Sequence, residues 1–324
     1  MRALQVEQFG DPSTSLTVSE VDERAPGQSE VKVRVAGVGV GYFDGLLIKG
    51  EYQIQPPLPF IPGSSFAGVV EQVGESVTQL QPGDHIAAFT LLGAMAEKIT
   101  LSADACLPLP EAVPLEEAAN FLIPYATALY GLRELGHLQP DETVLVLGAS
   151  GTTGSTAIEV AKAMGARVIA CASTADKRAR CEAAGADVTV DYTDENWRQA
   201  VKSAAGGRGV NVVYDPVGGD LAEPALRCLA PGGRFLVVGF VTGIARIPLN
   251  LPLLKRISIT GVNWGGEVME NPAVVPPVAQ QLVDWTLEGR LRAAPDHVYG
   301  LDQAAEAFNA LFERRSAGKV VIRP

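Results

Sequence analysis

The sequence predicts an α/β protein with two domains, and three observations support this fold class. The 324 residues are enough for two domains with sizeable cores. Short alternating runs and turn residues fill roughly the first 120 residues, whereas strand and helix patterns alternate from residue 121. The 34 Gly and 22 Pro residues favour a turn-rich fold over a helical bundle.

The N-terminal part predicts antiparallel β structure. The stretch "EVKVRVAGV" alternates apolar and polar residues through Val31, Val33 and Val35, which is typical of a half-buried strand. Further short strand candidates are "FAGVVEQVG", "HIAAFT" and "MAEKITL", with the turn-forming stretches "IPGSS" and "LQPGDH" between them. Together they predict a β barrel or sandwich rather than a parallel sheet.

The central part predicts a parallel sheet of six strands, namely "TVLVLG", "RVIACAS", "DVTVDY", "VNVVYDPV", "GRFLVVGF" and "ISITGVN". The helical stretches "GSTAIEVAKAMG" and "TADKRARCEAAG" connect the early strands, and each ends at a glycine in C-cap position. Continuous apolar strands with helical crossovers predict a parallel sheet covered on both faces. Six such strands match the doubly wound Rossmann layout.

The C-terminal part predicts two helices, "VVPPVAQQLVDWTLEG" and "LDQAAEAFNALFERR", and a closing strand, "GKVVIRP". A closing strand needs a partner, and we expect it to pair within the N-terminal β domain. The expected domains are therefore residues 1–120 plus 268–324, and residues 121–267.

Composition and charge exclude several classes of function. A net charge of −11 argues against nucleic acid as a partner, because phosphate binding needs a concentrated basic surface. The N-terminus lacks the apolar core of a signal peptide, and no apolar run reaches the length of a membrane span. The cysteines form no CxxC pair, which suits a reducing compartment; they are Cys106, Cys171, Cys181 and Cys228. We expect a cytoplasmic protein that binds neither membrane nor nucleic acid.

A glycine-rich loop follows the first predicted strand of the central part. In "VLVLGASGTTGSTA", Gly151 would let the backbone approach a pyrophosphate, and Gly154 would let the helix pack tightly on the strand. The helix N-terminus then offers N–H groups and the positive end of its dipole to phosphates. Ala149 stands where the first glycine of the motif often lies, and a tight turn without a ligand is the alternative. The candidate phosphate-binding residues are Ser150, Gly151, Thr152, Thr153 and Gly154.

The end of the next strand bears on which dinucleotide binds. An NAD site has an acidic residue there for the ribose 2′-hydroxyl, but this strand ends in Ser173 and Thr174. Asp176 follows, and Lys177 comes directly after it. A hydroxyl and a cation suit a 2′-phosphate, so the sequence favours NADPH. The alternative for Lys177 is a solvated helix face.

With these motifs in place, the whole chain resembles the zinc-free, ζ-crystallin-like quinone oxidoreductases of the medium-chain dehydrogenase/reductase superfamily. The resemblance rests on "GEYQIQPPLPFIPGSSFAGVV", "PYATALYGL", "ASGTTGSTAIEVAKAMGARVIA", "VYDPVGG", "GGRFLVVGF" and "GKVVIRP". It implies a GroES-like β-barrel domain, built from both ends of the chain, around a central Rossmann domain. It also implies a homodimer, commonly formed along the edge of the Rossmann sheet.

The resemblance implies the remaining site residues. Ser173, Lys177 and Tyr192 would surround the adenosine 2′-phosphate, and Thr127 would approach the nicotinamide. Tyr52 corresponds to a tyrosine of the substrate cleft; there its neutral phenol could donate a hydrogen bond to the acceptor carbonyl, or the ring could simply pack at the rim. The candidate catalytic residues are therefore Tyr52 and Thr127. The residues expected to flank the nicotinamide ribose and carboxamide are Phe240, Val241, Asn263 and Trp264.

The ligand positions of the zinc-dependent relatives carry no zinc ligands in this chain. Gly41 stands in place of a cysteine, Ser64 and Ser65 replace a His–Glu pair, and the third position, near residues 125–127, offers neither Cys nor His. We therefore expect no metal. Without a Lewis acid the favoured acceptors are already electron-poor, such as quinones and α,β-unsaturated carbonyls. Gly41 and Leu46, which replace the Asn and Tyr of the quinone-reducing relatives, predict a roomier and less polar pocket.

The sequence thus predicts an NADPH-dependent, zinc-independent oxidoreductase that transfers hydride to a quinone or an activated enone. One alternative is an enoyl-thioester or acryloyl-CoA-type reductase, whose CoA phosphates would need a basic patch such as Arg246, Lys255 and Arg256. The other alternative is a non-catalytic, crystallin-like protein that binds NADPH.

Overall fold

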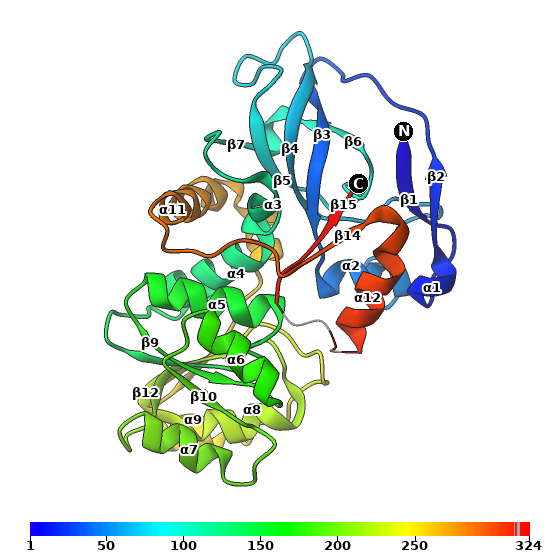
Figure 1. Cartoon of the computed structure of the whole chain (residues 1–324). Coiled ribbons are helices and arrows are strands. Elements are labelled where there is room, and N and C mark those ends of the chain that lie inside the picture. Colours follow the sequence, from blue (N-terminus) through cyan, green and yellow to red (C-terminus); the bar gives the residue numbers. More distant parts are fainter. Residues whose placement is uncertain (314, 316–317) are drawn as a thin grey trace. The chain divides into compact units, whose positions relative to one another are not determined.

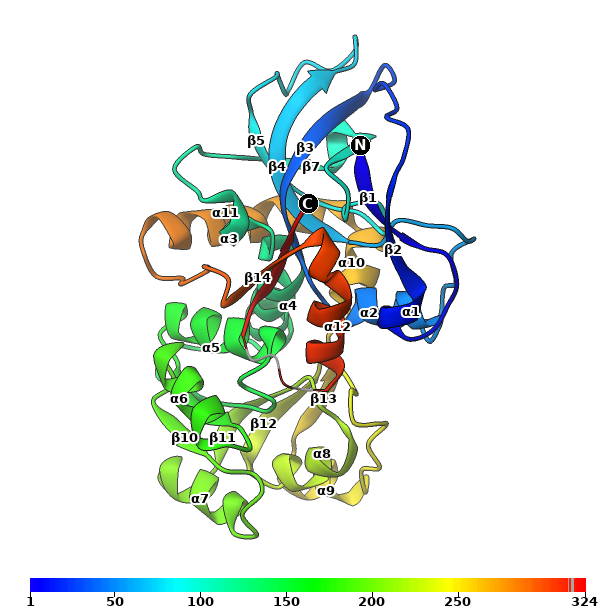
Figure 2. The ribbon, with the colours of Figure 1, turned by 45° about the vertical axis from the view of Figure 1, so that its right-hand side comes forward.

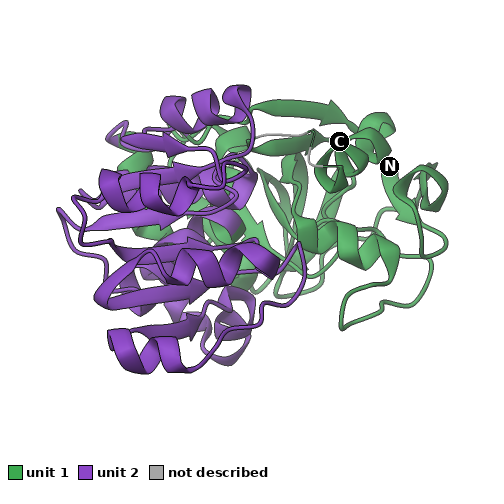
Figure 3. Ribbon diagram, turned by 90° about the horizontal axis from the view of Figure 1, so that it is seen from below, with its two compact units in different colours: residues 1–123, 279–287, 293–324 green, residues 124–278, 288–292 purple. Residues whose placement is uncertain are grey.

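The computed structural model describes residues 1–313, 315 and 318–324, and it divides into two compact units (Figure 3). Unit 1 comprises residues 1–123, 279–287 and 293–324, so it contains both ends of the chain. Unit 2 comprises residues 124–278 and 288–292.

Unit 1 contains a largely antiparallel sheet with the strand order β14-β15-β3-β4-β5-β7, and β6 pairs with β3 (Figure 1). Among the strand pairs of this sheet that the described residues form, β14–β15 is parallel and the others are antiparallel. A separate antiparallel pair is formed by β1 and β2. The strands are β1 (Arg2–Val6), β2 (Leu16–Glu20), β3 (Glu30–Gly39), β4 (Ser65–Val73), β5 (His85–Phe89), β6 (Lys98–Ser102), β7 (Cys106–Leu109), β14 (His297–Gly300) and β15 (Val320–Arg323). The antiparallel β domain predicted for the N-terminal part is confirmed.

The closing strand pairs where the sequence analysis expected it to. β15 lies antiparallel to β3, with Val321 opposite Gly39. The helices of this unit are short: α1 (Pro12–Ser15), α2 (Tyr42–Lys49), α3 (Leu115–Ala118), α12 (Ala304–Phe312) and 3-10 turns at Ala103–Ala105 and Leu301–Gln303. The alternation in β3 holds for Val31, Val33 and Val35, which are buried. It fails at Lys32, whose buried side chain forms an ion pair with Glu23.

Unit 2 contains a parallel sheet of six strands in the order β10-β9-β8-β11-β12-β13. The predicted doubly wound sheet is therefore confirmed. Its strands are β8 (Thr143–Val146), β9 (Arg167–Cys171), β10 (Val188–Val190), β11 (Val210–Asp215), β12 (Leu229–Val237) and β13 (Ser258–Gly261). The predicted glycines after the first two helices are Gly165 and Gly185, which adopt φ values of 84° and 104°.

The sheet of unit 2 carries helices on both faces (Figures 1 and 2). The helices are α5 (Thr152–Ala163), α6 (Ala175–Ala183), α7 (Trp197–Ala204), α8 (Gly219–Leu226), α9 (Asn250–Lys255) and α10 (Trp264–Glu270), with a 3-10 turn at Pro272–Val274. Apolar residues of α7, α8 and α9 share one core with residues of the sheet strands. The following helix, α11 (Val275–Leu287), runs from unit 2 into unit 1.

The segment before β8 is an irregular helix that the sequence analysis did not predict. It consists of a π-helical turn at Phe121–Tyr125, α4 (Ala126–Leu129) and a second π-helical turn at Tyr130–Leu135. Such turns are rare and often occur at functional sites. Among the described residues, none of the helices combines the length and the apolar character that a membrane crossing requires.

Candidate dinucleotide-binding site

The glycine-rich loop connects β8 to α5, as the sequence predicts. A Cβ atom on Gly154 would lie 2.4 Å from Gly148 O and 2.6 Å from the Ala149 Cα, so this position needs a glycine for the helix to approach the strand. Gly151 differs, because a Cβ atom there would meet only Gly148 O at 3.5 Å. The loop is therefore tightly packed on its inner side at Gly154 and roomy at Gly151.

The N-terminus of α5 fits a phosphate group. Its N-cap is Gly151, which has no side chain to cap the first-turn N–H groups, and that turn contains no acidic residue. These N–H groups and the positive end of the helix dipole suit an anion. Ser150, Thr152 and Thr153 are half-buried around the same turn.

The order of the strands places the other predicted residues on either side of this loop. Ser173 and Lys177 follow β9, and Tyr192 follows β10, on one side of β8. The opposite side of β8 holds β12 and β13, followed by the residues Phe240, Val241, Asn263 and Trp264. All of these follow the carboxyl ends of parallel strands, and the chain reverses its direction of winding between β8 and β11, which is where such sheets bind ligands.

On the β9 side, Thr174 is the N-cap of α6, and its Oγ1 accepts a hydrogen bond of 3.3 Å from the Lys177 N–H. Ser173 and Lys177 are half-buried. The guanidinium of Arg178 donates to Asp191 Oδ2 at 2.7 Å. Hydrogen bonds from Thr193, and then the Arg178 charge, hold the pKa of Asp191 below its usual value. Asp191 was not among the predicted site residues, although it stands next to Tyr192 in the stretch "DVTVDY".

On the β13 side, two of the predicted residues have internal contacts. Asn263 Oδ1 accepts a hydrogen bond of 3.1 Å from the Gly266 N–H and so caps α10. The Trp264 ring is only 5% exposed, and its centroid lies 5.4 Å from that of Tyr130. Phe240 and Val241, in contrast, are 62% and 39% exposed, and they offer an apolar surface that a ligand ring could cover. Thr127 is half-buried on α4, which packs against α5.

In unit 1, Tyr52 is half-buried, and its ring packs edge-on against Phe43 with centroids 4.7 Å apart. Two of the positions where the resemblance places zinc ligands have internal partners. The Gly41 N–H donates to Asp44 Oδ2 at 3.0 Å, and Ser65 Oγ donates to Ala119 O at 2.7 Å. No group of three or more His, Cys, Asp or Glu side chains that could hold a metal ion occurs among the described residues.

The carboxyl group of Asp44 is fully buried. Burial raises its pKa to about 6, although donors on Ser64 and Gly41 counteract part of this effect. Neither Asp44 Oδ1 nor Ser64 Oγ makes a hydrogen bond of good geometry in the described part of the chain. Asp44 therefore carries an unusually basic carboxylate for an aspartate.

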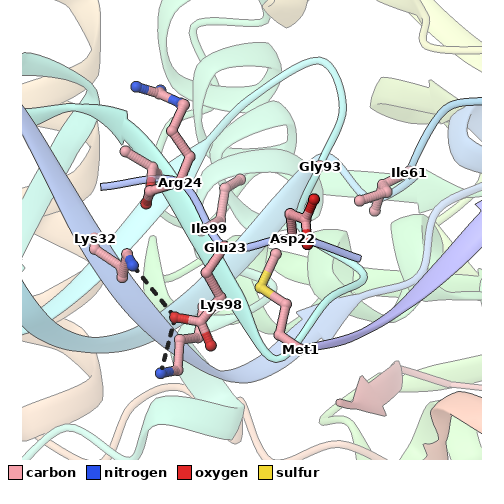
Figure 4. A pocket seen from close by; sticks show the side chains of 10 residues that line it. Met1, Asp22, Glu23, Arg24, Lys32, Ile61, Gly93, Lys98 and Ile99 are labelled. Atoms are coloured by element: carbon pink, nitrogen blue, oxygen red, sulfur yellow. Dashed lines mark hydrogen bonds and ion pairs between the residues drawn. The ribbon is translucent and has the colours of Figure 1, made fainter. Parts of the chain in front are cut away.

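A pocket of about 170 Å³ in unit 1 is lined by residues of a different kind (Figure 4). Glu23 accepts hydrogen bonds from both Lys32 and Lys98 at its wall. Lys32 and Lys98 are thus both paired with Glu23, and no predicted site residue lines this pocket.

The fold and the loop define a dinucleotide-binding protein with two units. Residues 152–282 match the family described as zinc-binding dehydrogenase, and residues 27–111 match the alcohol dehydrogenase GroES-like domain. These matches confirm the predicted combination of a GroES-like domain and a Rossmann-type domain.

Similar proteins and solved structures show to which family of dehydrogenases and reductases the chain belongs. Quinone oxidoreductase-like protein 2 of Mus musculus is 38% identical over 95% of this chain and 88% of its own length. The structure of Escherichia coli quinone oxidoreductase complexed with NADPH has a TM-score of 0.91 and 28% identity over 100% of both chains. The CurK enoyl reductase structure has a TM-score of 0.88 and 26% identity over 99% of this chain and 98% of its own. The chain is thus an oxidoreductase that belongs to the quinone oxidoreductase family of the medium-chain dehydrogenase/reductase superfamily.

Proposed function

We propose that this protein is an NADPH-dependent, zinc-independent reductase that transfers hydride to a quinone or to an activated α,β-unsaturated carbonyl compound. The observation that carries the proposal is the sequence at the end of β9. This end reads Ser173-Thr174 with no acidic residue at the strand tip, and Lys177 follows on α6 directly after Asp176. The Escherichia coli relative of known structure, which holds NADPH, supports the same cofactor.

The residues of unit 2 would bind and orient this cofactor. The N–H groups of the glycine-rich loop and of the first turn of α5 would hold the diphosphate. Ser173 and Lys177 would bind the 2′-phosphate beside Tyr192, and Arg178 would keep Asp191 paired, so that its charge repels the phosphate less. Phe240 and Val241 would cover the nicotinamide. The bound cofactor supplies the hydride.

The acceptor side of the proposal rests on unit 1. Tyr52 would donate a hydrogen bond to the oxygen of the acceptor on which negative charge develops. The positions Gly41, Ser64 and Ser65 lack the nitrogen and sulfur donors of a catalytic zinc site, so the acceptor must be electron-poor on its own. Gly41 and Leu46 leave room for bulky, apolar quinones or longer enones.

The second candidate is an enoyl-thioester reductase, which the likeness to the CurK enoyl reductase favours. A CoA thioester would need cations for its phosphates. Among the candidates, Lys255 is already occupied, because its Nζ donates to the carbonyl oxygens of Arg227 and Leu229 at 2.7 Å each. Arg246 and Arg256 alone would form a weaker patch, so we place this candidate second. A non-catalytic, crystallin-like role is the third.

The proposal includes a homodimer in the cytoplasm. The edge strand β13 leaves Ile259 37% exposed, and nearby in the sequence Leu249, Leu253 and Leu254 are 70–80% exposed. An unpaired sheet edge with apolar neighbours suits pairing with a second copy. The four cysteines are free, as in a reducing compartment. Sedimentation of the purified protein would test the dimer, and a monomer at micromolar concentration would contradict it.

The function itself is tested by following NADPH oxidation with four acceptors: 9,10-phenanthrenequinone, benzoquinone, an alkyl enone and crotonyl-CoA. The proposal predicts the highest kcat/KM for the phenanthrenequinone or the enone. Highest activity with crotonyl-CoA would favour the thioester reductase. Absence of turnover with all four acceptors would overturn both enzymatic hypotheses and favour the non-catalytic role.

A further inference from the structure

A buried glutamate on α5 joins two segments that are far apart in the sequence. Glu159 is only 4% exposed, and its Oε2 accepts a hydrogen bond of 2.7 Å from the Tyr125 hydroxyl. The same oxygen accepts one of 2.8 Å from the Arg292 N–H. A carboxylate is costly to bury unless donors surround it, so these bonds hold all three residues in place. We call Tyr125, Glu159 and Arg292 the Glu159 clamp.

The partners of Glu159 stand where the chain enters and leaves unit 2. Unit 2 begins at Pro124, one residue before Tyr125, and Arg292 is its last residue. The Arg292 guanidinium also donates to Ala183 O at 2.8 Å, at the end of α6. The Arg290 guanidinium donates to Ala163 O, at the end of α5. Residues 288–292 are thus fastened to both helices.

Where the chain enters unit 2, the Glu159 clamp holds α4, a short helix whose backbone hydrogen bonds are irregular at both ends. α4 lies between two π-helical turns, which interrupt the regular i to i−4 ladder. Bonds to other elements therefore help to fix its position. Two of them join the π-helical turn before α4 to α5: the Tyr125–Glu159 bond and a 3.3 Å bond from Thr156 Oγ1 to Pro124 O.

The same two helices carry two ends of the proposed cofactor site. α5 begins at the glycine-rich loop, and α4 contains Thr127. We propose that Glu159 is a positioning residue, which holds Thr127 at a set distance from the glycine-rich loop and thereby places the nicotinamide for hydride transfer. This inference rests on the proposed function, because Thr127 and the loop have their roles there.

The decisive variant is Tyr125→Phe, which removes one hydroxyl and keeps the ring. The matched control is Tyr214→Phe, because the Tyr214 hydroxyl is equally buried in unit 2 and makes no hydrogen bond with the described residues. For Tyr125→Phe we expect kcat with 9,10-phenanthrenequinone to fall about tenfold, since a misplaced reacting group slows the chemical step. The primary deuterium isotope effect from 4-deuterated NADPH should rise. The dissociation constant of adenosine 2′,5′-bisphosphate, which probes only the adenosine end, should stay unchanged.

Equal kcat values for Tyr125→Phe and Tyr214→Phe would overturn the inference. An equal loss of affinity for NADPH and for adenosine 2′,5′-bisphosphate in Tyr125→Phe would also overturn it, because that result indicates general loosening of unit 2. Glu159→Gln keeps one acceptor oxygen and should lose less kcat than Glu159→Ala. If the wild-type protein binds NADPH but reduces no acceptor, the proposed function fails. The clamp is then judged by the ratio of the NADPH and bisphosphate dissociation constants, which should rise about threefold in Tyr125→Phe; an unchanged ratio would overturn it.

Discussion

The loop between β8 and α5 and the segment from Gly41 to Ser65 differ in how glycine and small polar residues are used. In the loop, Gly154 permits a backbone approach that any Cβ would block. In the second segment, the Gly41 N–H donates to the Asp44 carboxylate, and the Ser65 hydroxyl donates to the Ala119 carbonyl. The loop therefore opens into a helix N-terminus that no side chain caps, whereas in the other segment an aspartate accepts a hydrogen bond from the N–H of the residue that begins the helix.

A glycine at a helix N-terminus can therefore stand in two different surroundings. Gly151 has room above its Cα, and no side chain caps the helix that it begins. Gly41 also begins a helix, but its N–H donates to the Asp44 carboxylate in the first turn, whereas the Gly151 N–H donates to the Gly148 carbonyl and the first turn of α5 holds no acidic residue. The two helix N-termini therefore differ in the charge beside them.

Substituting the two loop glycines should separate packing from binding, and it has the largest expected effect. Gly154→Ala places a Cβ 2.4 Å from a backbone oxygen, so we expect the protein to lose about 3 kcal/mol of unfolding free energy, or to fail to fold. Gly151→Ala meets nothing closer than 3.5 Å, so it should keep its stability while binding NADPH more weakly. Urea unfolding and NADPH titration measure both. Equal loss of stability in the two variants would contradict the distinction between Gly154, needed for packing, and Gly151, needed for binding.

Lys177→Glu should raise the KM for NADPH about a hundredfold, because the new carboxylate repels the 2′-phosphate, and it should change the KM for NADH little. Arg180→Glu makes the same change of charge on the same helix and serves as the control. An equal rise of the KM for NADPH in both variants would indicate a general electrostatic effect of α6 and would contradict a specific contact between Lys177 and the 2′-phosphate.

Asp44 should make stability depend on pH. Burial raises its folded-state pKa to about 6, above the value of about 4 in an unfolded chain, so the native state binds the proton more tightly. This contribution is fully present below about pH 4 and is lost as the pH rises through about 6. Asp44→Asn cannot ionise, so at pH 7 it should be more stable than the wild type by up to about 3 kcal/mol. Urea unfolding from pH 4 to 7 tests this, with the exposed Asp22→Asn as control; parallel curves for wild type and Asp44→Asn would refute it.

Removal of metal should have the smallest effect. Prolonged treatment with a chelator should leave kcat/KM within about twofold of its starting value, since the Gly41, Ser64 and Ser65 positions offer no zinc ligands. A loss of activity that added zinc restores would contradict the metal-free mechanism.

Local patterns in the sequence were sufficient to predict both sheets, the glycine-rich loop and the pairing of the closing strand. They could not reveal features that depend on distant residues. Lys32 alternates with valines, but its side chain is buried beside Glu23. A charged residue such as Glu159 in a predicted helix suggests solvent, yet α5 is buried along most of its length, and Glu159 accepts bonds from residues 34 and 133 positions away. The pairing of Arg178 with Asp191 likewise required the neighbouring strands to be in place.

The candidate site also combines residues that a local sequence pattern predicts with residues that it does not. The phosphate-binding loop has a local signature, because strand, glycines and helix are contiguous. Asn263 and Trp264 came only from resemblance, and the structure gives them a capping bond and a buried ring contact, which no local pattern separates from contact with a cofactor. Their role at the nicotinamide stays a prediction.

The proposed selection of NADPH by the end of β9 is tested most directly by the ratio of kcat/KM for NADPH to kcat/KM for NADH in the wild-type protein, measured with 9,10-phenanthrenequinone in excess. We expect a ratio of about a hundred or more, because the Lys177 cation would attract the 2′-phosphate of NADPH, which NADH lacks. A ratio near one would contradict it.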